Sequence, residues 1–428
     1  MKTKILFLFC VVTFPFVTEA QIEHVNYKFP DTNKTFNFIF GQKHQDTAMI
    51  RILLENAPQN FNAPGAGRFA IVGNQKKFYL SLSGYVKGTL SYDWKNPIVN
   101  NHAFITSSIP MDQTPGNEGL VQLGAQTSTL AINFVGLPGT KHQIGAYFNI
   151  NFSNTNYAPA IVNAYATYFG FKIGMAFSLY TDLMAGPPTI DFQGPNSWTL
   201  LPNAVLDYEY KFNKHWGVGI GIEMPIASYT TNTMTYAVNQ KVPDIPAYVQ
   251  YSWQNGSSWI RLSGIIRNMQ YRDVLAKENH NNVGWGAKLS GSALLFKNLT
   301  SFYQIAYGSG ASSYFQDLYG MQMDMLPNPH HNGKLANVNS WGAYLGLQYN
   351  FTKDIFASCT YSFVQANPTQ GYYAGDLYKS AQYVVGNVFW NVNSVIQLGL
   401  EYIWGDRQNM DHNYKSNNRI QTMIQVSF

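Results

Sequence analysis

Hydrophobic and polar residues alternate along most of this chain, from Lys77 to its last residue, Phe428. The pattern is clearest in the final stretch, residues 419–428, which reads RIQTMIQVSF. Ile420, Ile424 and Phe428 fall on one face of this stretch, and mainly polar residues fall on the other. A two-residue period is the signature of a β-strand between an apolar and a polar medium. The chain therefore predicts an all-β fold.

Sixteen segments show this alternation, and an even number suits a transmembrane antiparallel β-barrel made by a single bacterial chain. The segments are 78–94, 120–134, 142–152, 160–169, 172–179, 203–212, 216–226, 245–253, 259–268, 283–296, 299–308, 341–351, 355–363, 381–390, 395–404 and 418–428. Short turns and mostly long loops alternate between them, an order that a soluble sandwich has no reason to keep. We therefore predict a barrel of about 16 strands, with short periplasmic turns and long extracellular loops.

The composition fits a barrel better than a soluble domain. Charged residues make up 12% of the chain, about half of the roughly 25% that is usual in soluble domains. No segment after the first 20 residues has the 18 or more consecutive apolar residues that a membrane helix needs. Aromatic residues reach 15%, and tryptophans lie at or near predicted strand ends, as expected at a lipid–water boundary. These are Trp94, Trp216, Trp253, Trp259, Trp285, Trp341, Trp390 and Trp404.

The first 20 residues read as a secretory signal peptide, with Lys2 and Lys4, then an apolar run, and a predicted cleavage site before Gln21. We expect secretion across the inner membrane and a final location in the bacterial outer membrane. Removing the two lysines and one glutamate of this segment from the 28 basic and 23 acidic residues leaves a net charge of +4. That balance does not favour nucleic-acid binding.

The mature chain divides into two parts. Residues 21–76 lack the alternation and are predicted to form an N-terminal periplasmic arm, whereas residues 77–428 form the barrel. Cys359 is the only cysteine after cleavage, so the fold has no internal disulfide.

Charged residues on the predicted strands should face the lumen, because Lys or Arg at the lipid midplane costs about 2–4 kcal/mol. Each lies on the face opposite to its apolar neighbours. The predicted pore-lining residues are Lys87, Asp207, Glu209, Lys211, Glu223, Arg261, Arg267, Lys288, Glu401 and Arg419. Two interpretations remain open. The residues line a hydrated channel with a weak preference for anions, as the aqueous interior of a sixteen-stranded barrel allows, or they pair with one another and only solvate the lumen.

Two stretches resemble the DcaP-like family of trimeric outer-membrane porins. One is YTDLMAGPPTIDFQGPNSW, residues 180–198, and the other is the strand SGYVKGTLSYDW, residues 83–94. The resemblance implies a homotrimer of sixteen-stranded barrels that passes small, often negatively charged solutes such as dicarboxylates. It also implies a constriction loop at 180–202, folded into the pore. Its residues would be Asp182, Pro187, Thr189, Asp191, Phe192, Gly194 and Pro195, and the anion contacts would be Lys87, Arg261, Arg267 and Arg419.

The favoured hypothesis is an outer-membrane porin for passive diffusion of small hydrophilic solutes, with a preference for anions such as dicarboxylates. The alternatives are a barrel enzyme of the lipase or protease type and an adhesin or structural barrel with a closed lumen. No catalytic residue, cofactor or metal is expected. Gly217, Gly219 and Gly221 imitate part of a dinucleotide fingerprint, but no helix follows them. Expected partners are lipid, the solutes, further copies of the chain and the barrel-assembly machinery, which would recognise Phe428.

Overall fold

The computed structural model describes residues 36–40, 47–65, 67, 69–112, 115–368 and 374–428. The predicted signal peptide, residues 1–20, lies outside the described residues, as do residues 21–35 and 41–46 of the predicted arm. Residues 36–428 are described below as one unit. No described helix is long and apolar enough to cross a membrane.

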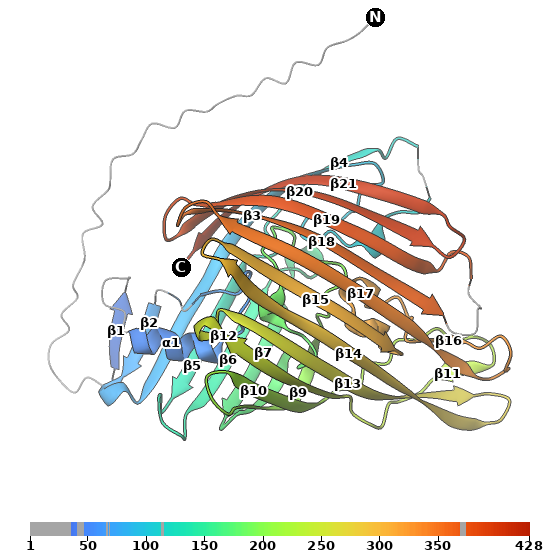
Figure 1. The fold of residues 1–428 in the computed structure, drawn as a ribbon, viewed down its shortest axis with the longest axis horizontal. Helices are drawn as coiled ribbons and strands as arrows, with labels where there is room; N and C mark the ends of the chain where they lie inside the picture. Colours follow the sequence, from blue (N-terminus) through green and yellow to red (C-terminus); the bar gives the residue numbers. More distant parts are fainter. Residues whose placement is uncertain (1–35, 41–46, 66, 68, 113–114, 369–373) are drawn as a thin grey trace, which may run out of the picture. The chain divides into compact units, whose positions relative to one another are not determined.

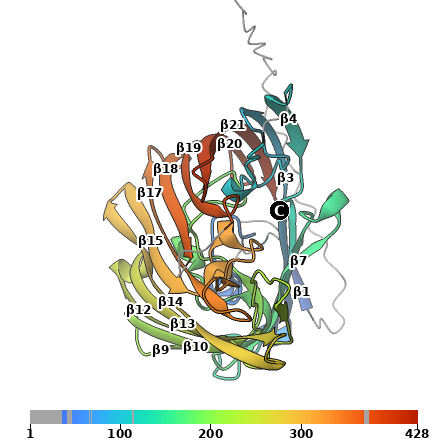
Figure 2. The ribbon, with the colours of Figure 1, turned by 90° about the vertical axis from the view of Figure 1, so that its right-hand side faces the viewer.

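Sixteen antiparallel strands form a closed barrel (Figures 1 and 2). The last strand, β21 (Tyr414–Ser427), pairs with the first, β3 (Phe78–Trp94), and this pairing closes the ring. The strands between them are β5 (Thr129–Gly136), β6 (Ile144–Asn151), β7 (Ala160–Tyr168), β8 (Phe171–Phe177), β9 (Pro202–Lys211), β10 (Trp216–Glu223), β12 (Ile245–Trp253), β13 (Ser258–Asp273), β14 (Glu278–Phe296), β15 (Leu299–Ser309), β17 (Leu335–Asn350), β18 (Ile355–Pro368), β19 (Tyr378–Asn391) and β20 (Ile396–Asn409). The predicted fold and strand number are confirmed.

The barrel strands differ in length around the ring. Strands β5 to β10, which we call the short wall, have 7 to 10 residues each. The barrel strands from β13 to β21, the long wall, have 11 to 19 residues each. One rim, the short-turn rim, is formed by the connections 74–77, 137–143, 169–170, 212–215, 254–257, 297–298, 351–354 and 392–395. The longer connections between successive barrel strands begin at the other rim, the long-loop rim.

Two details differ from the sequence-based expectation. The predicted strand 120–134 is divided into β4 (Gly119–Gly124) and β5, which pair one after the other with β3. The predicted loop 269–282 is the tip of the β13–β14 hairpin, paired from Met269↔Asn282 to Asp273↔Glu278. Beyond an apolar medium both faces of a strand can be polar, so the two-residue pattern disappears there although pairing continues. Two other short strands, β11 (Thr235–Ala237) and β16 (Met325–Pro327), pair with β13 and β17.

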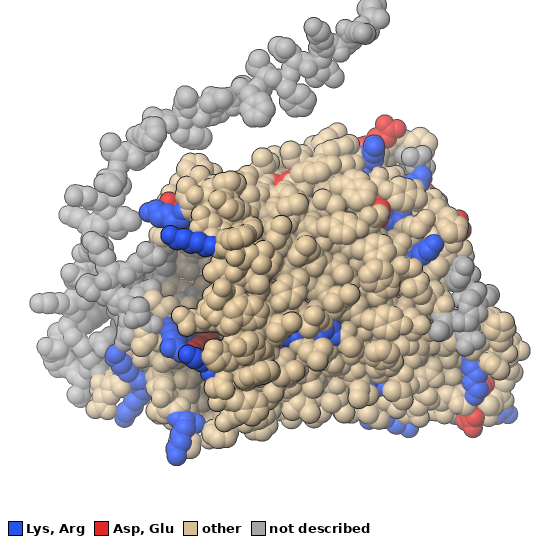
Figure 3. Space-filling model, viewed as in Figure 1, with Lys and Arg blue, Asp and Glu red and all other residues tan. Residues whose placement is uncertain are grey.

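The two faces of the wall have opposite character. On β3, Val86 and Leu90 are 58% and 44% exposed, whereas Lys87 between them is 1% exposed. Figure 3 shows few charged residues on the outer wall between the two rims. Trp259 was predicted at the lipid boundary, and this was wrong: it is 5% exposed, and its indole Nε1 donates to Asp182 Oδ2 inside the barrel at 3.1 Å.

The N-terminal arm supplies a helix and two strands. α1 (Thr47–Asn56) packs Met49 and Leu53 against residues on the inner face of the wall, including Tyr79 and Val135. β2 (Phe69–Gly73) pairs with β3 between Tyr79 and Leu82, beyond the point where β21 ends, and β1 (Phe36–Phe40) pairs with β2. The edge of β3 is therefore covered along most of its length. Single 3₁₀ turns occur at Asn74–Lys76, Thr106–Ser108, Thr155–Tyr157, Leu183–Ala185, Gln254–Gly256, Ser312–Tyr314 and Gln316–Leu318.

The seam ends at Phe428. Its N–H donates to Gly84 O at 2.9 Å, and the Gly84 N–H donates to Phe428 O at 3.2 Å. The Phe428 ring lies over Gly84, so a Cβ at that position would come within 2.8 Å of the ring. Glycine therefore leaves the space that the last aromatic side chain fills.

Candidate functional site

The connection between β8 and β9, residues 178–201, folds into the barrel. We call it the inward loop. It contains every residue predicted for the constriction loop: Asp182, Pro187, Thr189, Asp191, Phe192, Gly194 and Pro195. All of these are buried except Phe192, which is half-buried. Met184, by contrast, is 46% exposed. The loop thus presents only a small part of its surface to the lumen.

The first part of the inward loop is held by β13 and β14. Asp182 Oδ2 accepts hydrogen bonds from Trp259 Nε1 at 3.1 Å and from Ser290 Oγ at 2.8 Å, and lies 3.9 Å from Arg261 Nε. Lys288 Nζ donates to the carbonyl of Tyr180 and to a loop hydroxyl. Burial raises the pKa of Asp182, but the positive charges of Arg261 and Lys288 outweigh it and lower the pKa overall. Asp182 is therefore a fixed negative charge of the loop.

The middle of the loop is held by neutral donors of the long wall. Tyr344 Oη donates to Ala185 O at 2.9 Å. Ser358 Oγ and Asn387 Nδ2 both donate to Pro188 O at 2.9 Å. These donors come from β17, β18 and β19 in turn, so the loop follows the inner face of the long wall.

The far end of the loop meets two predicted pore-lining residues. Glu401 accepts the backbone N–H groups of Ile190 and Asp191 at 2.8 and 2.9 Å, and Lys87 Nζ donates to Ile190 O at 3.0 Å. The Asp191 carboxylate accepts hydrogen bonds from the Phe104 N–H, in the connection after β3, and from a tyrosine hydroxyl of β19. Burial and the nearby Glu401 charge raise the pKa of Asp191 to about 7.

Two predicted pore-lining arginines are enclosed and paired. Arg419 Nε lies 2.6 Å from Asp93 Oδ1, and both side chains are 0% exposed. Arg267 lies 2.9 Å from Asp244 and 3.2 Å from Asp324, which belong to two further loops that fold inward. A buried guanidinium without a counter-charge is strongly destabilising. Arg267 therefore fixes two loops to the wall, Arg419 joins the two strands of the seam, and neither presents free charge to the lumen.

The predicted charges that keep some exposure are near the short wall. The side chain of Arg261 is 16% exposed, and its guanidinium lies 4.1 Å from the centre of the Tyr248 ring. Glu209 is 37% exposed; it pairs with Lys172 at 2.8 Å and accepts from Tyr248 Oη at 2.6 Å. Lys211 is exposed at the last residue of β9.

Asp207 and Glu223 complete the predicted set, and both are enclosed at 0% and 1% exposure. Glu223 accepts the Leu179 N–H at the base of the inward loop, at 2.9 Å. Asp207 lies against Gly221, where an added Cβ would be 2.1 Å from its Oδ1. Tyr248 covers Gly219 in the same way. Two of the three glycines that imitate a dinucleotide fingerprint thus make room on β10 for side chains of the neighbouring strands.

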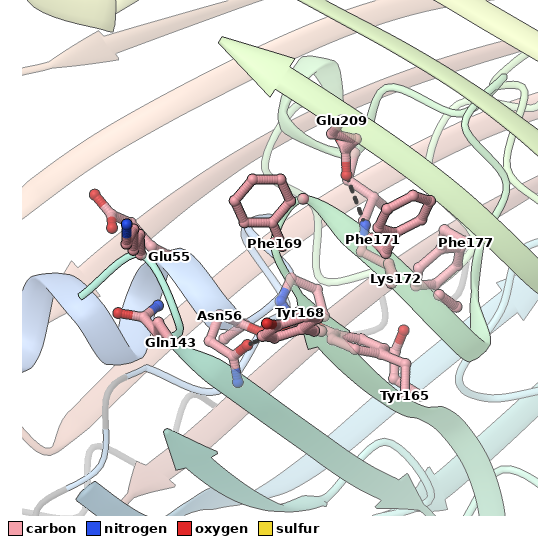
Figure 4. Close-up of a pocket in the computed structure, with 18 of the residues that line it drawn as sticks. Glu55, Asn56, Gln143, Tyr165, Tyr168, Phe169, Phe171, Lys172, Phe177 and Glu209 are labelled. Carbon is pink, nitrogen blue, oxygen red and sulfur yellow. Dashed lines mark hydrogen bonds and ion pairs between the residues drawn. The ribbon is translucent and has the colours of Figure 1, made fainter. Parts of the chain in front are cut away.

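A pocket of about 430 Å³ lies near the short-turn rim, between the end of α1 and the short wall. It is lined by residues 55–58, by the turn at 140–143, by β7 to β9 and by Leu183 of the inward loop. Figure 4 shows the Lys172–Glu209 pair on one side of this pocket and Asn56 and Tyr165 on another. Its lining combines amide, hydroxyl, aromatic and charged groups, which suits polar solutes.

The chain after α1 crosses the barrel near the short-turn rim. We call residues 57–62 the strap. Before it, the backbone carbonyl of Asn56 accepts a hydrogen bond from Tyr165 Oη of β7 at 2.8 Å. At its end, the Phe61 ring lies 4.9 Å from the Phe389 ring of β19. β7 and β19 are six positions apart in a ring of 16 strands, so the strap lies nearly along a diameter.

Several site residues were not predicted from the sequence, namely Asp93, Lys172, Asp244, Tyr248 and Asp324. For Asp93 and Lys172 a signal was present, because both lie on the polar face of their strands. Asp244 and Asp324 come from loops, where no periodicity indicates which way a side chain points.

Comparisons with known proteins support the same fold. No family model matches the chain, and no curated protein matches it. Among solved structures, it is similar to the outer membrane channel DcaP of Acinetobacter baumannii, with a TM-score of 0.71 and 19% identity over 82% of this chain and 97% of that one. An anion-selective porin from Comamonas acidovorans has a TM-score of 0.53 and 12% identity, over 82% and 100% of the two chains. OmpT of Vibrio cholerae has a TM-score of 0.52 and 10% identity, over 82% and 98%. The predicted likeness to DcaP is thus confirmed at the level of the fold.

The Asp93–Arg419 pair gives a test of how the barrel seam is stabilised. We expect Asp93→Asn to lower the free energy of unfolding by about 3–5 kcal/mol, because Arg419 would stay buried without a counter-charge. The measurement is urea unfolding of the refolded protein in lipid vesicles. Asp354→Asn, on a short turn, is the control and should change stability by less than about 0.5 kcal/mol. A similar small change at both positions would contradict this role of the pair.

Proposed function

We propose that this protein is a porin of the bacterial outer membrane, through which small hydrophilic solutes diffuse passively. The observation that carries the proposal is a closed barrel of 16 strands whose inward loop is bound to one side of the lumen. A barrel of this size encloses an aqueous interior that wall side chains alone do not fill. The likeness in fold to DcaP, described as an outer membrane channel, supports the same conclusion.

The solute path runs beside the short wall. The middle of the inward loop takes its hydrogen bonds from the long wall, and Leu183 of the loop borders the pocket of about 430 Å³ beside β7 to β9. Met184 is the exposed residue of the loop's first half, and Lys172 and Glu209 line the pocket. A solute that passes here meets polar groups on the wall and the edge of the loop.

A modest preference for anions follows from the charges that stay accessible. Arg261 and Lys211 of the predicted set keep exposure, whereas its one partly exposed carboxylate, Glu209, is paired with Lys172. The enclosed arginines contribute less, because each is neutralised by aspartate within hydrogen-bonding distance. The preference is therefore carried by a few residues near the short wall, and dicarboxylates fit it as a solute class.

The short wall also supports a homotrimer. A strand of 7 residues such as β8 extends roughly 23 Å, and a tilt of about 40° reduces its height to roughly 18 Å. This is less than the apolar band of about 25 Å that an outer-membrane barrel presents to lipid. Ala164 and Ala166 on the outer face of β7 allow close approach of another barrel. We infer that neighbouring copies cover this wall.

A barrel with a closed lumen is the second candidate. The specific observation in its favour is the strap, which crosses the lumen near the short-turn rim. The two candidates differ in one measurable property, the passage of ions through a single barrel.

The proposal is tested by single-channel recording in planar bilayers, where we expect stepwise conductance. Under a KCl gradient, the reversal potential should indicate a modest anion preference. Arg261→Glu should shift that potential towards cation selectivity, because it replaces an accessible positive charge with a negative one. Arg267 is unsuitable for this test, since it is enclosed between two aspartates.

Lys277→Glu is the matched control, because it makes the same change of charge at the exposed tip of the β13–β14 hairpin. It should leave the reversal potential nearly unchanged. Folded protein without stepwise conductance would refute the porin and favour the closed barrel. An equal shift of the reversal potential in both variants would show that Arg261 does not line the solute path.

The strap should restrict the current. Phe61 anchors it against the Phe356 and Phe389 rings, at 6.1 and 4.9 Å. Phe61→Ala should therefore loosen the strap and give a larger or more fluctuating unitary conductance in the same recordings. Phe296→Ala, at an exposed ring on the short-turn rim, is the control. Identical traces for the parent and both variants would show that the strap does not limit passage.

The trimer predicts a difference between the two walls. Ala166→Trp places a bulky ring on the outer face of β7 and should reduce the trimer fraction, as measured by native mass spectrometry of detergent-solubilised protein. Ala343→Trp places the same ring on the outer face of β17 and should leave the trimer intact. Dissociation by Ala343→Trp alone would show that the interface lies on the long wall. A monomeric parent would refute the trimer.

A further inference from the structure

The short-turn rim carries a ring of lysines. Its connections contain six lysines and one acidic residue, Asp354. Lys77, Lys141, Lys214, Lys297 and Lys353 are all exposed, as is Lys211 at the end of β9. Figure 3 shows blue predominating on the left-hand rim, whereas blue and red are mixed on the right. The ring is therefore a distinct positive surface of the molecule.

Three of these lysines, Lys214, Lys297 and Lys353, have no carboxylate partner, because the ion pairs among the described residues all involve other basic groups. A free ammonium group is a point charge with three donors, well suited to a phosphate. The rim thus has unused capacity to bind anions.

Three of the lysines have an exposed phenylalanine beside them in the sequence. Phe212 precedes Lys214, Phe296 precedes Lys297 and Phe351 precedes Lys353. The phenylalanines are 62%, 72% and 59% exposed. The same combination therefore recurs on three separate turns, at the ends of β9, β14 and β17.

An exposed phenylalanine next to a free lysine matches the two layers of a phospholipid surface. The aromatic ring suits the boundary between acyl chains and headgroups, and the lysine stem reaches past it to the phosphate. A passing soluble anion would have no use for an exposed ring on the outside of the barrel. The recurring aromatic partner therefore favours a lipid over a free solute.

We propose that the short-turn rim binds anionic phospholipid headgroups, with Lys214, Lys297 and Lys353 on the phosphates and the adjacent phenylalanines at the acyl boundary. The proposal rests on the barrel spanning a membrane, which is part of the proposed function, but does not require that the lumen conducts. The rim would then anchor the barrel in the leaflet on the side of the short turns.

Native mass spectrometry of the detergent-purified protein tests this binding. Phosphatidylglycerol and phosphatidylcholine with identical acyl chains are added at equal concentration, and we expect phosphatidylglycerol to be retained preferentially. The variant K214Q/K297Q/K353Q should lose roughly a hundredfold in affinity for it, at about fivefold for each lysine near an anionic surface. K214R/K297R/K353R keeps the charges and should restore binding.

The matched control is K95Q/K241Q/K277Q, which removes three exposed lysines from the long-loop rim and should retain the lipid. Equal retention of the two lipids would overturn the proposal, and so would equal losses in both glutamine variants. Displacement of the lipid by an equal concentration of inorganic phosphate would also overturn it, in favour of a free-anion site. Conductance is recorded separately, so lipid binding without conductance would refute only the porin, and conductance without lipid binding only this proposal.

Discussion

The structure depends on one constraint, that the backbone of the wall leaves no unpaired edge. In hydrocarbon an unsatisfied N–H or C=O group has no water to bind, so a sheet must close on itself. Here the closure is the pairing of β21 with β3, from Asn418↔Trp94 to Ser427↔Tyr85. β3 extends further than β21, and β2 pairs with the remaining part. The arm therefore completes the seam as well as supplying the helix and strap inside.

The same constraint explains how much of the fold the sequence predicts. Wherever a strand separates an apolar from a polar medium, its side chains alternate, and the number and order of the barrel strands follow from that alternation. The pattern fails at the tip of the β13–β14 hairpin, where Asp273 pairs with Glu278 and both faces meet water. It also fails inside 120–134, because alternation does not show that residues 125–128 leave the sheet.

The site is less predictable than the fold, for a physical reason. The alternation along the last strand shows on which face Arg419 lies. Its cross-strand partner Asp93 can be identified only once the register of the seam is known. The contacts of Lys87 and Glu401 depend on where Ile190 and Asp191 of the inward loop come to lie. Those contacts join residues 103 to 211 positions apart in the sequence, and no local pattern records them.

Pairing also changes what an inward-facing charge contributes to a pore. Counting Arg267 and Arg419 as lumen charges overstates the positive field, because their aspartate partners cancel most of it at close range and their side chains are 0% exposed. Lys87 and Lys288 donate to loop carbonyls and are nearly as enclosed. The charged groups that hold the inward loop are thus engaged in contacts that position it. In the proposed porin, selectivity then depends on the groups left over, namely Arg261, whose side chain is 16% exposed, and Lys172, which lines the pocket beside β7 to β9.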